Sequence, residues 1–281
     1  MNRHLVQLNV ATLRHPMDDP RIADFANALP VVNGAGEQSP GYVWRLQSDR
    51  GDATDIEVFE DPLMIVNLTV WESLESLKAF AYRGIHRDFF RRRAEWFVEG
   101  STRTALWWVP AGELPTTDDA KRRLDFINVL GSSPFAFEMG QNQPAMVLER
   151  VGAEDHRAAK MIDDTCEPAP TGDLEGFVVV ELDDVAVACG EYRTLDDRRA
   201  DITQLYVAKS ARGLRVGVAI IAELETLARA DGRQRIALET SPKLVPTLEN
   251  FGWRQSDSRE APVGSPRSVC MEKALGATQA V

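Results

Sequence analysis

Residues 205–219 read LYVAKSARGLRVGVA, and this stretch is the most informative one for predicting the fold of the chain. The apolar start predicts a strand that ends near Val207, and a short turn follows. A helix is expected to begin near Gly213, because Val216 and Ala219 recur on one helical face. The stretch therefore predicts a strand, a turn and a long helix in direct succession.

The glycines of this stretch favour the close approach of a phosphorylated ligand. Gly213 and Gly217 have no side chains, so a ligand can come near the backbone. The first N–H groups of a helix have no partner within the helix, and the helix dipole places partial positive charge there. We expect this end to receive a pyrophosphate, with charge-assisted contacts from Arg212 and Arg215. For the two glycines alone, a purely structural turn is the alternative.

The stretch resembles the acetyl-CoA signature of the GNAT superfamily, Arg/Gln-x-x-Gly-x-Gly/Ala. Arg212 and Gly217 occupy the first and last positions, and Arg215 stands where a glycine is usual. Downstream, residues 248–253 (LENFGW) are similar to the family's Tyr-x-x-x-Gly-Phe segment, with Leu248 in place of the tyrosine. The resemblance covers roughly residues 145–275.

This resemblance implies acetyl transfer from acetyl-CoA to a small-molecule amine. It implies that a strand edge pairs with the pantetheine arm and that the turn and helix start hold the pyrophosphate. The cofactor-binding residues would be Leu205, Tyr206, Val207, Arg212, Gly213, Leu214, Arg215, Val216, Gly217 and Val218.

The implied reaction also needs groups that move protons. The amine must be neutral to attack, so a carboxylate or an ordered water removes its proton. Glu191 and Asp201 lie on the strands expected to flank the thioester, and either is a candidate base; an ordinary strand carboxylate is the alternative for both. Family members often carry a tyrosine at the position of Leu248 to protonate the departing thiolate, which leucine cannot do. Tyr206 is a candidate substitute, with a packing role as the alternative.

The second half of the chain is expected to form a mixed sheet, with antiparallel hairpins first and a strand–helix–strand crossover after them. We expect strands at residues 145–151, 176–182, 185–192, 200–207, 235–239 and 268–272, and helices at residues 154–164, 214–230 and 243–250.

The first half alternates strands and helices, which predicts an α+β sheet covered by helices on one face. A short polar segment ending in Pro144 predicts the boundary between a domain at residues 1–141 and another at residues 145–281. We expect strands at residues 5–10, 42–46, 64–71, 104–109 and 135–139. We expect helices that begin near residue 20 and at residue 74, and further helices at residues 86–97 and 117–130.

Segments of the first half resemble an uncharacterised bacterial family whose fold looks like the dimeric α+β barrels of antibiotic-biosynthesis monooxygenases. This resemblance, over about residues 3–140, implies a ferredoxin-like barrel and a homodimer, and it brings no assigned reaction. His86 and Trp71, with the pair Trp107 and Trp108, are candidates to line an apolar pocket with one titratable group. A histidine satisfied within its helix is the alternative.

Composition narrows the class of protein further. The formal net charge is −11, which argues against nucleic acid as a partner. The three cysteines form no CxxC pair and the four histidines do not cluster with them, so no metal site is expected. No apolar stretch is long enough for a membrane span, and the chain is expected to be cytoplasmic.

The sequence as a whole predicts an α+β protein: a ferredoxin-like dimeric barrel followed by a GNAT mixed-sheet domain that acts as an acetyl-CoA-dependent N-acetyltransferase. Two alternatives stay open. Leu248 and Arg215 favour a catalytically weak CoA-sensing or ligand-binding protein. The other alternative places an oxygenase or isomerase in the first half.

Overall fold

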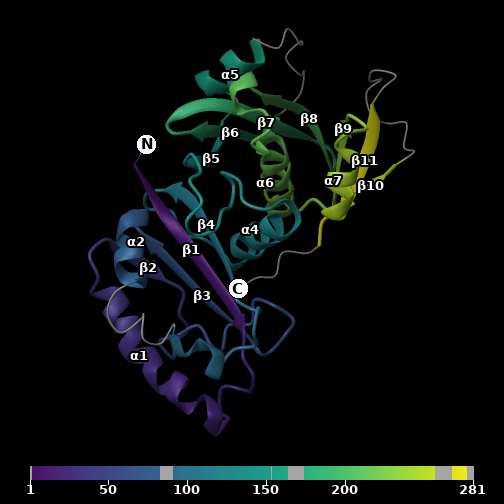
Figure 1. Cartoon of the computed structure of the whole chain (residues 1–281). Coiled ribbons are helices and arrows are strands. Elements are labelled where there is room, and N and C mark those ends of the chain that lie inside the picture. The colour runs from purple at the N-terminus through teal and green to yellow at the C-terminus, as the bar shows by residue number, and fades with distance from the viewer. Residues whose placement is uncertain (1, 83–90, 153, 164–173, 257–267, 277–281) are drawn as a thin grey trace. The chain divides into compact units, whose positions relative to one another are not determined.

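The computed structural model describes residues 2–82, 91–152, 154–163, 174–256 and 268–276 (Figure 1). The chain divides into two compact units, Met1–Gln143 and Pro144–Val281. Each unit has its own sheet.

The first unit has a four-stranded sheet of order β2-β3-β1-β4, in which every pair of neighbours is antiparallel. Its main elements are β1 (Arg3–Thr12), α1 (Ala23–Glu37), β2 (Tyr42–Arg45), β3 (Met64–Trp71), α2 (Leu74–Ala81), β4 (Arg103–Pro110) and α4 (Thr117–Leu130). Two short 3₁₀ helices, Pro20–Ile22 and Arg93–Glu95, accompany them.

Local capping explains where the helices of this unit begin. The Ser73 side chain accepts a hydrogen bond from the Ser76 amide at the start of α2. Thr116 and Asp119 form a reciprocal capping box at the start of α4. These interactions involve residues three apart, and the predicted starts of both helices are confirmed.

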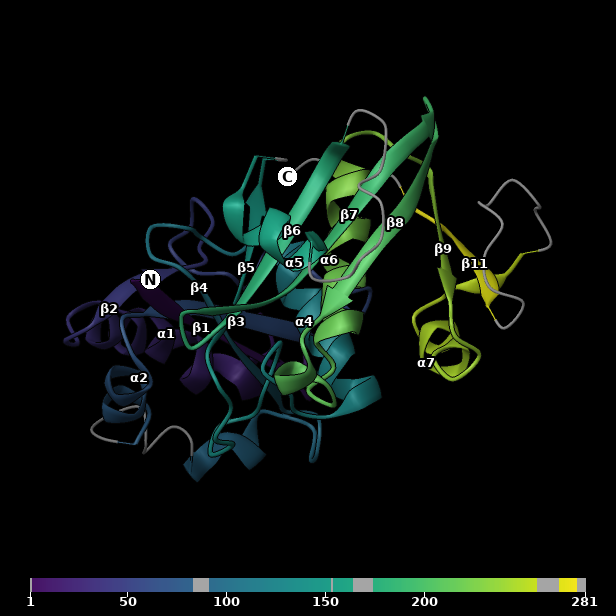
Figure 2. The ribbon, with the colours of Figure 1, turned by 90° about the horizontal axis from the view of Figure 1, so that it is seen from above.

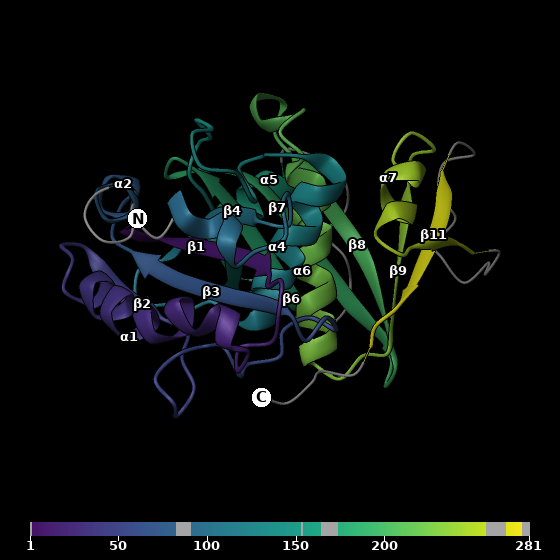
Figure 3. The same ribbon diagram turned by 60° about the horizontal axis from the view of Figure 1, so that its bottom comes forward.

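The two faces of the first sheet differ in what covers them. On β1, Gln7 and Asn9 line a cavity together with residues of α1. Helix α1 lies along this face of the sheet (Figure 3). The intervening Val6 is fully buried on the opposite face and pairs with Trp107, whose ring lies 5.7 Å from the Arg123 guanidinium of α4. Helices therefore cover both faces, and the prediction of one covered face is wrong because α4 returns along the far side.

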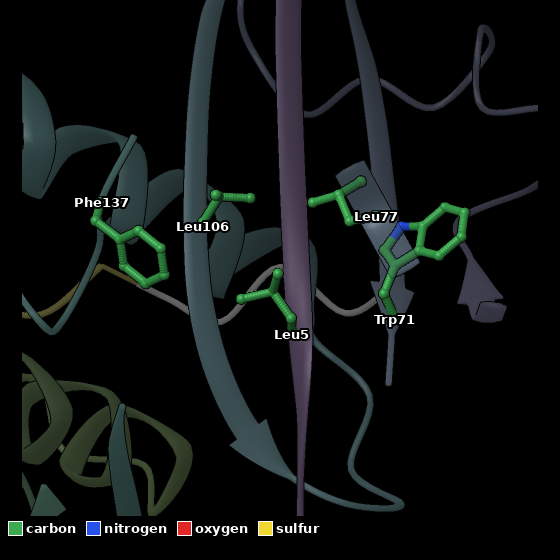
Figure 4. Close-up of a cluster of buried hydrophobic side chains, with 5 residues drawn as sticks. All are labelled: Leu5, Trp71, Leu77, Leu106 and Phe137. Atoms are coloured by element: carbon green, nitrogen blue, oxygen red, sulfur yellow. The ribbon is translucent and has the colours of Figure 1, made fainter. Parts of the chain in front are cut away.

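A hydrophobic cluster closes one end of the cavity face (Figure 4). It joins Leu5, Trp71 and Leu106 of the sheet to Leu77 of α2 and to Phe137. Each of these side chains is at most 2% exposed. This cluster anchors α2 against the sheet and leaves the middle of the face to more polar side chains.

Two predicted elements of the first unit differ from the structure. Residues 135–139 do not form a strand: Phe137 makes an isolated bridge to Leu106, and Ala136 makes one to Ser133. The helix expected at residues 86–97 lies partly outside the described residues; its described part is helical at Arg91 and Arg92 and continues as the 3₁₀ turn Arg93–Glu95. Phe97 then bridges to Leu13, which draws the chain out of the helix.

The second unit has a seven-stranded sheet of order β10-β11-β9-β8-β7-β6-β5. Only β8 and β9 pair in parallel, which confirms the predicted mixed sheet and crossover. Its elements are β5 (Met146–Val151), α5 (His156–Asp163), β6 (Leu174–Leu182), β7 (Val185–Asp196), β8 (Arg199–Val207), α6 (Val216–Ala230), β9 (Arg235–Thr240), α7 (Val245–Asn250), β10 (Arg254–Gln255) and β11 (Val269–Ala274).

Helices α5 and α6 cover opposite faces of this second sheet, named here the α5 face and the α6 face (Figure 2). Met161 of α5 packs against Cys189 of β7. The next residue, Gly190, faces α6, where an added Cβ would lie 2.5 Å from Ile220 Cγ2. Glycine is required at this position because the helix approaches the strand so closely.

Helix α6 begins at Val216, three residues after its expected start. Gly213 (φ +84°) and Arg215 (φ +65°) both have left-handed backbone conformations, which a continuing α-helix excludes. A 3₁₀ turn, Lys209–Ala211, fills the connection from β8. Among the described helices of the chain, none has the length and apolar character needed to cross a bilayer.

Candidate functional site

The centre of the second unit is a divergence between the two parallel strands. The register of β8 and β9 ends at Ile202 and Leu238, whereas β8 continues to Val207 (Figure 2). Residues 203–207 thus have no described strand partner on the β9 side, and Leu205 is 39% exposed. A free strand edge of this kind can pair with an extended ligand through main-chain hydrogen bonds.

A β-bulge sits at the point of divergence. Glu191 of β7 pairs with Gln204 and Tyr192 pairs with Ile202, so Thr203 is the extra residue on β8. Its hydroxyl donates a 2.8 Å hydrogen bond to Glu191 Oε1. The bulge interrupts the regular ladder where the open edge begins, which leaves backbone groups available there.

The amino end of α6 follows directly from the open strand. The amides of Ala211, Arg212 and Leu214 donate within the connecting turn. Among the described residues, no acceptor is found for the amides of Val216 and Gly217, nor for that of Val218, and no side chain caps the helix. Free amides at a helix start, in the positive end of the dipole, suit an anionic ligand.

The start of α6 lies beside β8 at Gly217. An added Cβ there would meet Val207 at 3.7 Å and Leu205 at 3.8 Å, both ordinary contacts. Arg212 and Arg215 are exposed on either side of the turn, and Arg212 Nε lies 3.5 Å from the Val207 carbonyl oxygen. The predicted cofactor-binding residues thus follow one another along the chain from the open strand edge to the helix start, where the side chains of Val216 and Val218 are buried.

Because side chains alternate along a strand, those of β7 and β8 near the open edge point to two different faces of the sheet. Leu205 and Val207 point toward α6, whereas Tyr206 packs with the cluster around Cys189 on the α5 face. Glu191 and Asp201 share the α5 face, because Tyr192 between Glu191 and Arg193 points the other way and bonds to Asp231 after α6. The three candidate catalytic side chains therefore lie on one face, opposite α6.

Burial sets the electrostatics of the two candidate bases. Glu191 is fully buried and its Oε2 has no described hydrogen-bond partner; desolvation raises the pKa of this carboxyl. Asp201 is 6% exposed, and burial raises its pKa against the opposing influence of Arg193, whose Nη2 lies 3.8 Å from Asp201 Oδ2. Each of the two carboxyls therefore has a pKa above that of a solvated carboxyl.

Two further residues of this face did not figure among the sequence-based candidates. Glu239 of β9 and Cys270 of β11 are register partners on the α5 face, across the divergence from Asp201. Glu239 contributes to the raised pKa of Asp201, and the pKa of Cys270 is raised by burial and by both carboxylates. A small cavity of about 40 Å³ is lined by Asp201, Ala237 and Cys270. A glutamate directly after the apolar run at residues 236–238 of β9 was the available signal.

The remaining candidates lie elsewhere. Leu248 is buried in α7, and its amide bonds to the Leu244 carbonyl. His86 lies outside the described residues. Trp71 lines a cavity of about 380 Å³ in the first unit. Within the described part of the chain, no group of His, Cys, Asp or Glu side chains is arranged to hold a metal ion.

Comparison with known proteins adds two family matches. Residues 147–252 match the family described as Acetyltransferase (GNAT) family, and residues 4–152 match the one described as Domain of unknown function (DUF3291). No curated protein matches the chain.

Several solved acetyltransferases are similar to the chain in fold. A Streptococcus agalactiae acetyltransferase has 18% identity and a TM-score of 0.36, over 46% of this chain and 98% of that one. A GNAT family acetyltransferase from Elizabethkingia anophelis with acetyl-CoA bound has 9% identity and a TM-score of 0.35, over 46% and 98%. The Escherichia coli ribosomal-protein-S18-alanine N-acetyltransferase has 12% identity and a TM-score of 0.38, over 48% and 96%.

The second unit is an acyltransferase domain of the GNAT class, which uses acetyl-CoA, and this class follows from the family match. Its open strand edge and free helix amides fit that cosubstrate. The chain itself belongs to the DUF3291 family, whose model spans more than half of its length.

Proposed function

We propose that the protein transfers an acetyl group from acetyl-CoA to an amine of a small molecule. The observation that carries the proposal is the junction of β8 and α6, where an open strand edge leads to helix amides without acceptors. Residues 203–207 would hold the pantetheine arm, and the start of α6 with Arg212 would hold the pyrophosphate. Acetyl-CoA supplies the thioester, whose carbonyl carbon bonds the amine nitrogen as the C–S bond breaks and sulfur leaves as the thiol.

The acceptor would approach on the α5 face. The carboxyls of Glu191, Asp201 and Glu239 outnumber the one guanidinium beside them, that of Arg193, and this excess of acidic groups favours a substrate that arrives as an ammonium ion. Such a substrate must lose a proton before it attacks. A carboxylate on the α5 face would both attract the ammonium ion and remove its proton.

Asp201 is our choice for that base, directly or through a water in the adjacent 40 Å³ cavity. Glu191 is the second choice because its side chain has no exposed surface. Leu248 cannot protonate the thiolate, so Tyr206, on the same face, or water would do so.

Asp201→Asn is expected to lower kcat by about 100-fold or more and to leave the Kd for acetyl-CoA unchanged, because general-base catalysis contributes roughly that factor. The base acts only when ionised, so the wild-type rate should fall as the pH drops through the raised pKa of Asp201. That acidic limb should vanish in the variant. Asp197→Asn, exposed in the β7–β8 turn, is the control and should keep it. An unchanged acidic limb in Asp201→Asn would assign the limb to another group.

The reaction itself is tested by following free thiol from acetyl-CoA against a panel of small amines. Thiol release that depends on one amine class, with stoichiometric acetylated product, supports the proposal. Calorimetry that detects no acetyl-CoA binding contradicts it. Tight binding without turnover on any amine would favour the CoA-sensing alternative, which the buried Leu248 and the arginine at position 215 support.

For the first unit we propose a ferredoxin-like dimeric α+β barrel that makes the chain a homodimer. The support is the βαββαβ order of elements and the sheet order β2-β3-β1-β4. The mass by light scattering is expected to be twice that of one chain. A monomer at micromolar concentration would contradict the dimer. Helix α4, which already covers Trp107, limits the area left for a partner sheet.

A further inference from the structure

The first unit contains a cavity of about 380 Å³, within the size range of small-molecule sites. It lies between α1 and one face of the sheet formed by β1, β3 and β4. Its floor carries polar side chains, and its walls are mostly apolar. The charged residues of the lining, Arg45, Asp52 and Arg93, all have partners within the protein. The residues on which the argument depends are Gln7, Asn9, Thr69, Trp71 and Thr104.

The polar floor is unusual for a covered sheet face. On the opposite face of the same strand, Val6 and Leu8 are fully buried and apolar. On the cavity face the corresponding positions are Gln7 and Asn9, and Gln7 is only 7% exposed. Burial of an amide costs free energy unless its polar atoms find partners. Their placement therefore calls for a ligand or an internal partner for each polar atom.

Internal hydrogen bonds satisfy only one end of the Gln7 amide. The Trp71 indole Nε1–H donates to Thr69 Oγ1 over 2.9 Å, and the Thr69 hydroxyl donates to Gln7 Oε1 over 3.0 Å. An indole nitrogen can only donate, so this relay runs in one direction. The Gln7 carbonyl oxygen is thereby used, and its NH₂ group has no partner among the described residues.

Asn9 repeats the arrangement two residues further along β1. The Thr104 hydroxyl, on the other neighbouring strand, donates to Asn9 Oδ1 over 2.8 Å. The Asn9 NH₂ group likewise has no described partner. Residues two apart on a strand share a face and lie about 7 Å from each other. Gln7 and Asn9 therefore present two amide donors, each oriented by a threonine, from positions with that spacing. The amide of Asn67, opposite Asn9 on β3, also lines the cavity.

The walls add flat apolar surface. The rings of Trp71 and Phe80 stack with centroids 5.3 Å apart, and Tyr42 meets Trp71 edge-on at 5.6 Å. Phe25 and Trp96 contribute a second ring pair at 5.6 Å. Trp71 and Trp96 are themselves buried, so the exposed ring surface of the lining comes from Phe25, Tyr42 and Phe80. Partly exposed rings of this kind favour a planar, apolar molecule.

We propose that this cavity binds an uncharged aromatic molecule carrying carbonyl-type oxygens at two ends, each accepting from one of the amides of Gln7 and Asn9. Neutral amide donors suit neutral carbonyl acceptors, and the spacing of the donors suits substituents on opposite sides of one ring. The site lies wholly within the first unit, so it is independent of acetyl transfer by the second.

The test compares para-diacetylbenzene, which has two carbonyl oxygens, with para-diisopropylbenzene, which has nearly the same shape and none. Binding is followed by the tryptophan fluorescence of Trp71 and Trp96, which line the cavity, and by calorimetry. The diketone is expected to bind roughly 10-fold or more tightly than the hydrocarbon, from two net hydrogen bonds. Equal binding of the two probes, or no binding of either, would overturn the proposal.

Variants then assign the preference to the amides. Gln7→Met combined with Asn9→Leu keeps side-chain volume and removes both donors, so the two probes should bind within about twofold of each other. Asn9→Leu alone tests one donor if the double variant does not fold. Gln47→Met, an exposed position outside the cavity, is the control and should keep the wild-type preference. A variant without the donors that still prefers the diketone would contradict the assignment.

Discussion

Gly217→Glu is expected to weaken acetyl-CoA binding by about 100-fold, roughly 2.7 kcal/mol. A carboxylate at this position would face the phosphates, and like charges brought together at a binding surface cost several kcal/mol. The substitution should not harm the fold. Gly217 is half-buried, its φ is not positive, and the nearest atoms to an added Cβ are at ordinary contact distance.

Gly217→Glu is expected to weaken acetyl-CoA binding without lowering stability, so the test distinguishes a lost binding site from a damaged fold. Glycine within a helix is less favourable than other residues by up to about 1 kcal/mol, and an acidic side chain in the first turn is favourable. The thermal midpoint of the free variant should therefore be equal to or above that of the wild type. Isothermal calorimetry with acetyl-CoA measures the affinity.

Two further variants distinguish the effect of the added charge from the effect of the added volume. Gly217→Ala should give an intermediate loss, because it adds bulk without charge. Gln234→Glu adds the same charge in the exposed turn after α6 and should bind like the wild type. If Gly217→Glu retained wild-type affinity, the pyrophosphate would not lie at this end of α6.

Glu225→Ala is expected to lower the free energy of unfolding of the second unit by about 3 kcal/mol or more. Glu225 Oε1 accepts a 2.7 Å hydrogen bond from the Trp253 indole nitrogen, and Oε2 pairs with Lys273 of β11. Glu225 and Trp253 are 6% and 1% exposed. Alanine would leave a buried N–H and a largely covered ammonium group without their partner.

The position of Glu225 explains why the loss should be large. The outer strands β9, β11 and β10 join the rest of the sheet only through the short parallel register between residues 199–202 and 235–238. Glu225 ties α6, which packs on β6–β8, to residues on the far side of the divergence. Glu225 therefore fixes the position of the outer strands beside the open edge of β8, in addition to forming its local hydrogen bonds.

Urea unfolding measures this effect, and the transition that acetyl-CoA raises identifies the second unit. Glu225→Gln, which can still accept from Trp253, should lose less than the alanine variant. Glu249→Ala, at an exposed position, is the control and should change stability by at most about 0.5 kcal/mol. Glu225→Met with Lys273→Met should recover most of the loss, since a buried ion pair can be replaced by apolar packing. Failure of that pair to recover would show that the hydrogen bond to Trp253 dominates.

Elements with strong local signals were predicted closely. Residues 64–71 and 117–130 match β3 and α4 at both ends, because apolar alternation and the capping box act within a few residues. The start of α6 was predicted three residues early, because two left-handed residues, one of them Arg215, extend the turn. Residues 135–139 have the composition of a strand, but no neighbouring strand offers them a full register.

The strand, turn and helix of residues 205–219 could be predicted from the sequence, because each of these elements is formed by residues that are neighbours along the chain. The acidic α5 face and the paired amides of the first unit depended on the tertiary structure. Asp201 meets Glu239 only through the register of β8 with β9, and Gln7 meets Thr69 only through the register of β1 with β3. A shift of one residue in either register would turn these side chains to the other face, and a linear sequence does not specify that pairing.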